Sequence, residues 1–211
     1  MHVSDGILSA PALAAGFAGT AALTALTLRK MDMEEIPKVS VVTAVFFVAS
    51  LIHVPIGAAS VHLILNGLVG VVLGRRAFPA VLLGIVLQAI LFGHGGVSVI
   101  GVNALMMGTG ALAAYGIWRL RRRVALARRE FVFGALAGVT ATLVSGLILA
   151  VALATTGEAF WATAGYVLAA HVPIMVVEGL VVGACAAFLA RVKPTVLADA
   201  EPRAAVGGAV S

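Results

Sequence analysis

Five histidines are the residues in this sequence best suited to chemistry: His2, His53, His62, His94 and His171. We expect each of them at or near a helix end on the side that carries no Lys or Arg. Imidazole is the commonest transition-metal ligand among side chains, so a group of histidines at one depth favours a metal site. The alternative for any single member is a structural histidine that makes only hydrogen bonds.

His2 differs from the other histidines because it follows the first residue. The amine of Met1, the amide nitrogen of His2 and its imidazole can bind one cation in fused chelate rings. A fourth nitrogen in the same plane would complete a square-planar set, which Ni(II) and Cu(II) favour over zinc, calcium or magnesium. We expect Met1 to be retained, because no signal peptide is recognisable and a bulky second residue disfavours its removal.

His62 is the candidate for the fourth nitrogen. The residues before it, Ala58, Ala59 and Ser60, are small and would let the N-terminal segment approach closely. Asn66 follows one helical turn later as a possible partner that orients the ligand. Whether His2 and His62 meet depends on the tertiary structure.

Further polar residues are expected close to these ligands. Asp5 and Gly6 could form a turn in which the carboxylate accepts backbone N–H groups, or Asp5 could cap a helix that starts near Pro11. Gln88, His94 and Asn103 flank the glycine-rich stretch 93–96, where close backbone approach or movement is possible.

His53 precedes Pro55 and is expected in an outer loop on the path by which an ion arrives. Glu178 follows His171 by seven residues and is the one carboxylate well inside an apolar run. It should be hydrogen-bonded or paired. A structural bond to another helix is the main interpretation, and a proton or metal relay with His171 is the alternative.

The composition indicates a membrane protein. Hydrophobic residues make up 62% of the 211 residues, charged residues only 11%, and the mean hydropathy is +1.12. Such a chain has too little polar surface for a water-soluble globule, so lipid is its expected solvent. Runs that are apolar at every position favour helices over a membrane β-barrel. Candidate helices follow the apolar runs 8–28, 38–52, 61–73, 79–92, 99–119, 131–155 and 163–190.

Basic residues give the expected topology. Every Lys and Arg falls on a connection after the first, third, fifth or seventh candidate helix, and the positive-inside rule makes those connections cytoplasmic. We therefore expect an all-α membrane protein, a bundle of seven transmembrane helices with the N-terminus outside and the C-terminus cytoplasmic. Residues 1–193 should form a single transmembrane metal-binding domain and 194–211 a flexible cytoplasmic tail.

Several segments resemble the NikM/CbiM family, the substrate-binding subunits of energy-coupling-factor nickel and cobalt importers. The resemblance lies in the opening Met1-His2-Val3-Ser4-Asp5-Gly6, the segment 60–63 around His62, the run 88–96 with Asn103, and His171-Val-Pro with Glu178. It covers nearly the whole chain. The sequence departs from the family where His94 replaces a usual aspartate and where 58–60 is less rich in Gly, Ser and Thr.

This resemblance implies that the amine of Met1, the backbone nitrogen and imidazole of His2, and the imidazole of His62 hold the ion. It implies Ni(II) or Co(II) as transported ligand, with no cofactor, and the Asp5-Gly6 opening is more like the nickel branch than the branch that imports cobalt for cobalamin biosynthesis. It also implies a prokaryotic inner membrane, a transmembrane coupling subunit, two cytoplasmic ATPases and often a small accessory membrane protein.

Other function classes fit the sequence less well. No phosphate-binding loop is present, so ATP hydrolysis would come from partner chains. The net charge of +5 does not indicate nucleic acid, because no aromatic residues are interleaved with the basic clusters. An intramembrane protease would need a His-Glu-x-x-His or Gly-x-Ser-x-Gly motif, and neither occurs. An autonomous ion-coupled carrier or channel remains an alternative function. A structural scaffold is a further alternative, but it would not explain why the histidines cluster.

Overall fold

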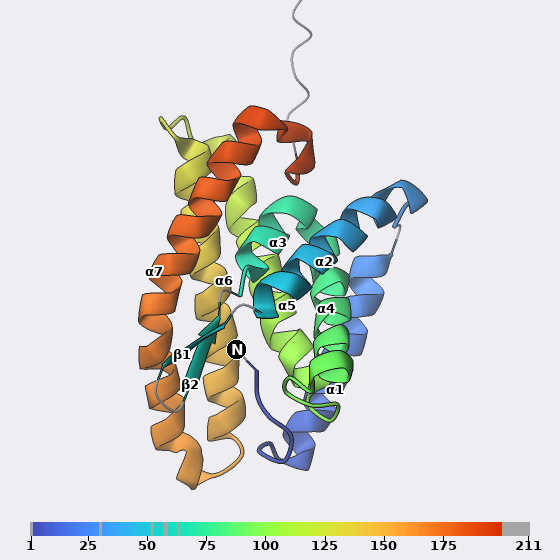
Figure 1. The fold of residues 1–211 in the computed structure, drawn as a ribbon, viewed down its shortest axis with the longest axis vertical. Helices are drawn as coiled ribbons and strands as arrows, with labels where there is room; N and C mark the ends of the chain where they lie inside the picture. Colours follow the sequence, from blue (N-terminus) through green and yellow to red (C-terminus); the bar gives the residue numbers. More distant parts are fainter. Residues whose placement is uncertain (1, 30, 52, 57–58, 63, 200–211) are drawn as a thin grey trace, which may run out of the picture.

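The computed structural model describes residues 2–29, 31–51, 53–56, 59–62 and 64–199, without the side chains of 53–56 and 59–62. The described chain forms a helical bundle in which the longer helices run roughly side by side (Figure 1). Its α-helices are α1 (Ala10–Leu28), α2 (Ile36–Leu51), α3 (Asn66–Leu73), α4 (Ala77–Phe92), α5 (Ile100–Leu120), α6 (Arg129–Ala154) and α7 (Trp161–Val192). Two short strands, β1 (His53–Ile56) and β2 (Ala59–His62), pair antiparallel.

The helices form a multi-pass membrane protein. Five helical stretches in the described residues are long and apolar enough to cross a membrane, and one of them runs from Asn66 through α3 and α4 to Phe92. Large apolar side chains such as Ile90, Leu147 and Val176 are exposed on the outside of the bundle. Exposed apolar surface of this extent is expected only where lipid is the solvent. The protein is thus mostly helical, as the composition predicted.

The predicted helix 61–73 is wrong in its first part. Residues 59–62 form β2, Leu65 has a left-handed backbone with φ 53°, and α3 begins only at Asn66. A residue in this conformation cannot continue a right-handed helix, because its φ has the opposite sign to that of helical residues. The chain therefore changes direction at Leu65, and α3 has only 8 residues. The other predicted helices are found with shifts at their ends.

Small residues allow neighbouring helices to approach closely. Gly70 of α3 faces α5, where an added Cβ would lie 2.1 Å from the carbonyl oxygen of Ala111. Gly138 of α6 faces α7, where an added Cβ would lie 2.7 Å from the carbonyl oxygen of Glu178. Close packing of this kind is how helices associate in lipid, where no hydrophobic force drives them together.

The end of the bundle that carries the arginines is closed by hydrogen bonds. Arg76, between α3 and α4, is 2.8 Å from the Glu35 carboxylate and donates to the carbonyl oxygen of Thr27 at the end of α1. Three segments that are separate in the sequence are thereby tied at one end, where the basic connections also lie. The Arg76 side chain is 10% exposed and that of Glu35 is 38% exposed, so the contact is only partly shielded from water.

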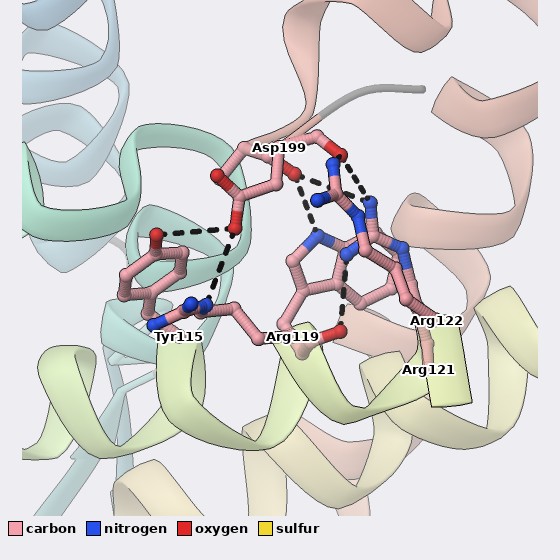
Figure 2. Close-up of polar contacts among 7 residues, drawn as sticks. Tyr115, Arg119, Arg121, Arg122 and Asp199 are labelled. Atoms are coloured by element: carbon pink, nitrogen blue, oxygen red, sulfur yellow. Dashed lines mark hydrogen bonds and ion pairs between the residues drawn. The ribbon is translucent and has the colours of Figure 1, made fainter. Parts of the chain in front are cut away.

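The segment after α7 folds back onto α5, as Figure 2 shows. Trp118 Nε1 and Arg121 Nη2 donate to the carbonyl oxygen of Ala198 at 3.1 and 3.2 Å, and Tyr115 donates to the Asp199 carboxylate at 3.1 Å. The backbone N–H of Ala198 donates to Val71 in α3 at 2.9 Å. We call the contacts of Ala198 and Asp199 with Trp118 and Arg121 the C-terminal clamp.

The C-terminal clamp corrects the predicted domain boundary. Residues 194–199 were expected in a flexible tail, but Leu197 and Ala198 are buried at 5% and 8% exposure and belong to the folded domain. The composition of 194–211 did not reveal this, because the bonds are made by backbone groups that every sequence carries. Residues 200–211 lie outside the described residues.

Candidate functional site

The N-terminal segment 2–9 enters the bundle and is held there through its backbone. Val3 is 3% exposed; its N–H donates to Asn103 Oδ1 at 2.9 Å, and its carbonyl accepts from Asn103 Nδ2 at 3.1 Å. Asn103 is fully buried in the first turn of α5. One side-chain amide therefore pairs with both polar groups of a residue next to His2, as a neighbouring strand would.

Asp5 attaches the same segment to the loop between α4 and α5. Its N–H donates to the carbonyl of Gly95 at 2.8 Å, and its carboxylate accepts the N–H of Ser98 at 3.1 Å and the Ser98 hydroxyl. The α1 N-cap is Ser9. Of the two interpretations of Asp5, the structure thus shows the carboxylate accepting a backbone N–H and not capping a helix.

The loop glycines are required for this approach. Gly96 has φ 107°, and an added Cβ would lie 1.9 Å from Asp5 Oδ2. Gly95 has φ 77°, and its added Cβ would lie 2.7 Å from Asn103 Nδ2. Both positions therefore have a backbone conformation that favours glycine, and neither has room for a side chain. The glycine-rich stretch serves close backbone approach, one of the two roles expected for it.

The ring of His2 is oriented by a chain of hydrogen bonds from α4 to α2. His2 Nε2 lies 2.7 Å from Gln88 Oε1, Gln88 Nε2 donates to Ser50 Oγ at 2.6 Å, and Ser50 Oγ donates to the carbonyl of Phe47 at 2.6 Å. Because the Ser50 proton goes to a carbonyl, Ser50 must accept from the Gln88 amide. The Gln88 oxygen then faces His2, which must donate from Nε2. In the neutral His2 ring the lone pair is then on Nδ1.

His94 lies beside the ring of His2. The two ring centroids are 6.2 Å apart with an interplanar angle of 24°, and the Phe92 ring is 6.2 Å from that of His94. These contacts place His94, which is half-buried, beside the His2 ring. The structure thus brings together five of the residues singled out from the sequence: His2, Asp5, Gln88, His94 and Asn103.

Some other predicted site residues are described only by their backbone or not at all. Met1 lies outside the described residues. His62 and Ser60 are described by their backbone in β2, and His53 pairs with His62 in the register of the two strands. The side chains of these three residues lie outside the described part of the chain. Among the residues that are described, no group of three or more His, Cys, Asp or Glu side chains gathers for a metal.

Asn66 is not placed as expected. It is the first residue of α3, fully buried, and its Nδ2 donates to the carbonyl of Met107 in α5 at 3.2 Å and to Ser145 Oγ in α6 at 3.0 Å. The predicted spacing of one helical turn from His62 is wrong, because His62 lies in a strand and not in the same helix. Asn66 joins three helices.

His171 and Glu178 are buried in α7, at 3% and 1% exposure. His171 Nδ1 is 2.5 Å from the carbonyl of Val167 in its own helix, and the ring faces Gly146 of α6. Its Nε2 has no hydrogen-bond partner within the described chain. Glu178 accepts backbone N–H groups from Ile64 and Leu65. These bonds agree with a structural link to another segment and give no continuous path between the two side chains.

Ser50 and Ser98 are site residues that the sequence did not reveal. Ser50 is 3% exposed and fixes the Gln88 amide, and Ser98 holds the Asp5 carboxylate. Serine is common in membrane helices and loops, so neither has a distinctive pattern. The only available signal was their position: Ser50 lies close to the end of α2, and Ser98 closely follows the glycine-rich stretch 93–96.

Known proteins are similar to this chain in sequence and in fold. A family model described as the cobalt uptake substrate-specific transmembrane region, CbiM, matches residues 2–196. The chain is 35% identical to a putative metal transport protein of Haemophilus influenzae over 93% of this chain and 97% of the relative. It is 31% identical to a fused nickel transport protein, NikMN, of Rhodobacter capsulatus over 90% of this chain and 59% of that longer protein.

Solved structures agree with the fold. The crystal structure of a transition metal transporter superposes with a TM-score of 0.75 at 24% identity and covers 91% of this chain and 93% of that one. At this identity the likeness concerns the fold. Taken with the family match over 2–196 and the Haemophilus relative of nearly equal length, it places the protein in the CbiM family.

Proposed function

We propose that this protein is the substrate-binding membrane subunit of an energy-coupling-factor importer and that it captures Ni(II) or Co(II) from the outer side of the membrane. The observation that carries the proposal is the hydrogen bond of His2 Nε2 to Gln88, at 2.7 Å, because it leaves the lone pair on Nδ1. That nitrogen and the backbone nitrogen of His2 can close a six-membered chelate ring on one cation.

The ligand set would be completed by two further nitrogens. The amine of Met1 closes a second chelate ring with the His2 backbone nitrogen, and the imidazole of His62 takes the fourth position in the plane. Such a site needs a segment that is fixed before the ion arrives, since ordering a free chain would weaken binding. The bonds of Val3 to Asn103 and of Asp5 to the 93–98 loop supply this preorganisation.

Nickel is the cargo that we propose first. Four nitrogens in one plane suit Ni(II), and the Asp5-Gly6 opening is more like the nickel branch of the family. Relatives are named for both metals: the Rhodobacter protein for nickel, and a protein of Geobacter sulfurreducens, 30% identical over 94% of this chain and 62% of its own length, for cobalt. Cobalt import for cobalamin biosynthesis is the alternative cargo for the same mechanism.

Energy and topology complete the proposal. Two cytoplasmic ATPases and a transmembrane coupling subunit would reorient the bundle and release the ion inward, and a small accessory membrane protein would assist loading. All seven helices would be embedded in the membrane, with the N-terminus outside. The ties from Arg76 to Glu35 and Thr27 support this topology, because they gather basic connections at one end, which the positive-inside rule makes cytoplasmic.

Isothermal titration of the purified protein with Ni(II) and Co(II) tests the site. We expect one ion per chain and loss of binding in His2→Gln and His62→Ala. Glutamine is chosen at position 2 because a small residue there would expose Met1 to removal, and mass spectrometry confirms the intact start. The matched control is His171→Gln, whose imidazole bonds its own helix and should not affect affinity. Unchanged affinity in His2→Gln and His62→Ala would reject the site.

Transport assays separate the importer from an autonomous carrier. In liposomes, the chain alone should not accumulate Ni(II), and uptake should require ATP and the coupling and ATPase subunits. Uptake by the lone chain, driven by an ion gradient, would contradict the proposed class.

A further inference from the structure

The chain leaves β2 and enters α3 through a junction that is held by Glu178. The carboxylate, 1% exposed, accepts the N–H of Ile64 and that of Leu65, the latter at 3.0 Å to one oxygen and 3.2 Å to the other. These donors precede the N-terminus of α3, where N–H groups have no partner within the helix. A carboxylate at this place also interacts favourably with the positive end of the helix dipole.

The junction is strained and needs such support. Leu65 has φ 53°, a left-handed conformation that costs a residue with a branched side chain about 1 kcal/mol or more. It persists only where surrounding contacts determine it. Asn66, the next residue, donates to Met107 of α5 and Ser145 of α6. Residues 64–66 are therefore fixed from α5, α6 and α7 together.

His62 is the last residue of β2 and lies two positions before Ile64. Two residues of extended chain span at most about 7 Å, so an anchor at Ile64 sharply limits where the His62 backbone can lie. β2 also pairs with β1, in which His53 lies opposite His62 and follows the end of α2 by two positions. The position of the His62 backbone thus depends on the anchor at residues 64–66 together with the pairing to His53.

We infer that Glu178 is a positioning residue of the metal site: by accepting the N–H groups of Ile64 and Leu65 it sets the place of His62, without contacting the ion. This inference rests on the proposed function. It assigns a task to the one acidic side chain that is fully buried in the described structure. A positioning residue needs an acceptor oxygen at this place, and the effect of its removal should appear in the geometry and strength of metal binding.

The test compares Glu178→Ala with Glu178→Gln in the full-length protein. Alanine removes both acceptor oxygens, and glutamine keeps one at the same distance along the side chain. We expect Ni(II) affinity, measured by isothermal titration, to fall about 10- to 100-fold in Glu178→Ala, the usual effect of losing a residue that orients a ligand. Glu178→Gln should restore most of the affinity. The ligand-field absorption spectrum at saturating Ni(II) should change in the alanine variant and return in the glutamine variant.

Thr142→Val is the matched control. Thr142 is equally buried, in α6, and within the described residues its hydroxyl donates to its own helix, to the carbonyl of Gly138 at 3.1 Å. This variant should leave the affinity and the spectrum unchanged even where it lowers thermal stability. It therefore reports what a loss of stability alone does to binding.

The outcomes separate this inference from the proposed function. If wild type binds Ni(II) through His2 and His62 while Glu178→Ala binds it with wild-type affinity and spectrum, the positioning role is wrong and the proposed function stands. If Glu178→Ala does not fold, Glu178→Gln decides: wild-type binding supports the role of the acceptor oxygen, and a loss as great as that of His62→Ala contradicts it. If wild type binds no metal, both proposals fail.

Discussion

His2 Nε2 lies 2.7 Å from Gln88 Oε1, and Gln88 in turn donates to Ser50 Oγ at 2.6 Å. This relationship determines which ring nitrogen of His2 carries its proton. Without the chain of bonds from α4 to α2, the ring could adopt either tautomer and either orientation. In the proposed site, Gln88 thus decides which nitrogen of His2 is available as a ligand, although Gln88 itself would not contact the ion.

Gln88→Leu tests this dependence. The variant removes the acceptor for His2 Nε2, so the ring loses its fixed tautomer, and Ni(II) affinity should fall about 10- to 100-fold. Gln88→Glu keeps an acceptor for His2 and should retain most of the affinity. Isothermal titration measures both. Equal affinity in wild type and Gln88→Leu would show that His2 is oriented by something else.

Asn103→Leu should release the N-terminal segment. The change leaves the N–H and the carbonyl of the buried Val3 without their partner, at a cost of roughly 1–3 kcal/mol for each group that finds no other. The amine of Met1 should then react faster with an amine-labelling reagent, as followed by mass spectrometry. Asn103→Asp keeps the acceptor for Val3 N–H and should react at an intermediate rate. A rate that is the same in all three proteins would argue against the anchor.

Gly96→Ala should separate the 93–98 loop from Asp5. An added Cβ would lie 1.9 Å from Asp5 Oδ2, so either the carboxylate or the loop must move. The control is Gly93→Ala: Gly93 also has a positive φ, 65°, but nothing lies within 4 Å of its added Cβ. Both variants carry a backbone cost of about 1 kcal/mol. Only Gly96→Ala should also weaken Ni(II) binding, and similar affinities in the two variants would contradict this prediction.

The Glu35–Arg76 pair predicts an acid-dependent loss of stability. The hydrogen bond from Arg76 is the main cause that holds the pKa of Glu35 below its usual value of 4.5. A carboxyl group whose pKa is lowered on folding stabilises the protein above its unfolded pKa, and this contribution is lost as the pH falls through the lower, folded pKa. The Glu35 side chain is 38% exposed, so after solvent screening the effect should be a few tenths to about 1 kcal/mol.

Thermal unfolding of wild type and Glu35→Gln, measured from pH 7 down to the acid limit of folding, checks this sign. The difference in melting temperature should be largest at neutral pH and should disappear in acid, where Glu35 is protonated in both folded and unfolded chains. A difference that grows as the pH falls would have the wrong sign and would contradict the assignment.

Arg121→Met should open the C-terminal clamp. Arg121 is 6% exposed, donates to Ala198 and Asp199 at 3.2 and 3.0 Å, and lies 4.0 Å from the centroid of the Trp118 ring. Its removal leaves buried carbonyls with fewer donors, so the folded state should lose roughly 1–3 kcal/mol. Arg123→Met, at an exposed neighbour, is the control and should have little effect. Thermal unfolding distinguishes the two, and equal melting temperatures would show that the clamp contributes nothing.

Some residues of the candidate site could be predicted from the sequence, whereas their contacts could not. Gln88 and Asn103 were singled out because they flank the glycine-rich stretch 93–96 and belong to the segments that carry the family resemblance. The partner of Gln88, the His2 ring, is 86 positions away, and the partner of Asn103, the Val3 backbone, is 100 positions away. No local sequence pattern indicates either partner. Ser50 and Ser98 were missed because a serine in such a segment is too common to be a signal.

The sequence by itself determined that the protein lies in a membrane, that it is mostly helical, and the order of its helices. These features follow from composition and from continuous apolar stretches that need no distant partner. It also supplied the prediction that the first two residues chelate an ion, because that prediction depends only on adjacent atoms. The tertiary structure decided that 59–62 is a strand, that α3 begins at Asn66, and that residues 194–199 belong to the fold. These features depend on hydrogen bonds from other helices, such as those of Glu178 and Arg121, whose free energy is gained only when the whole bundle has formed.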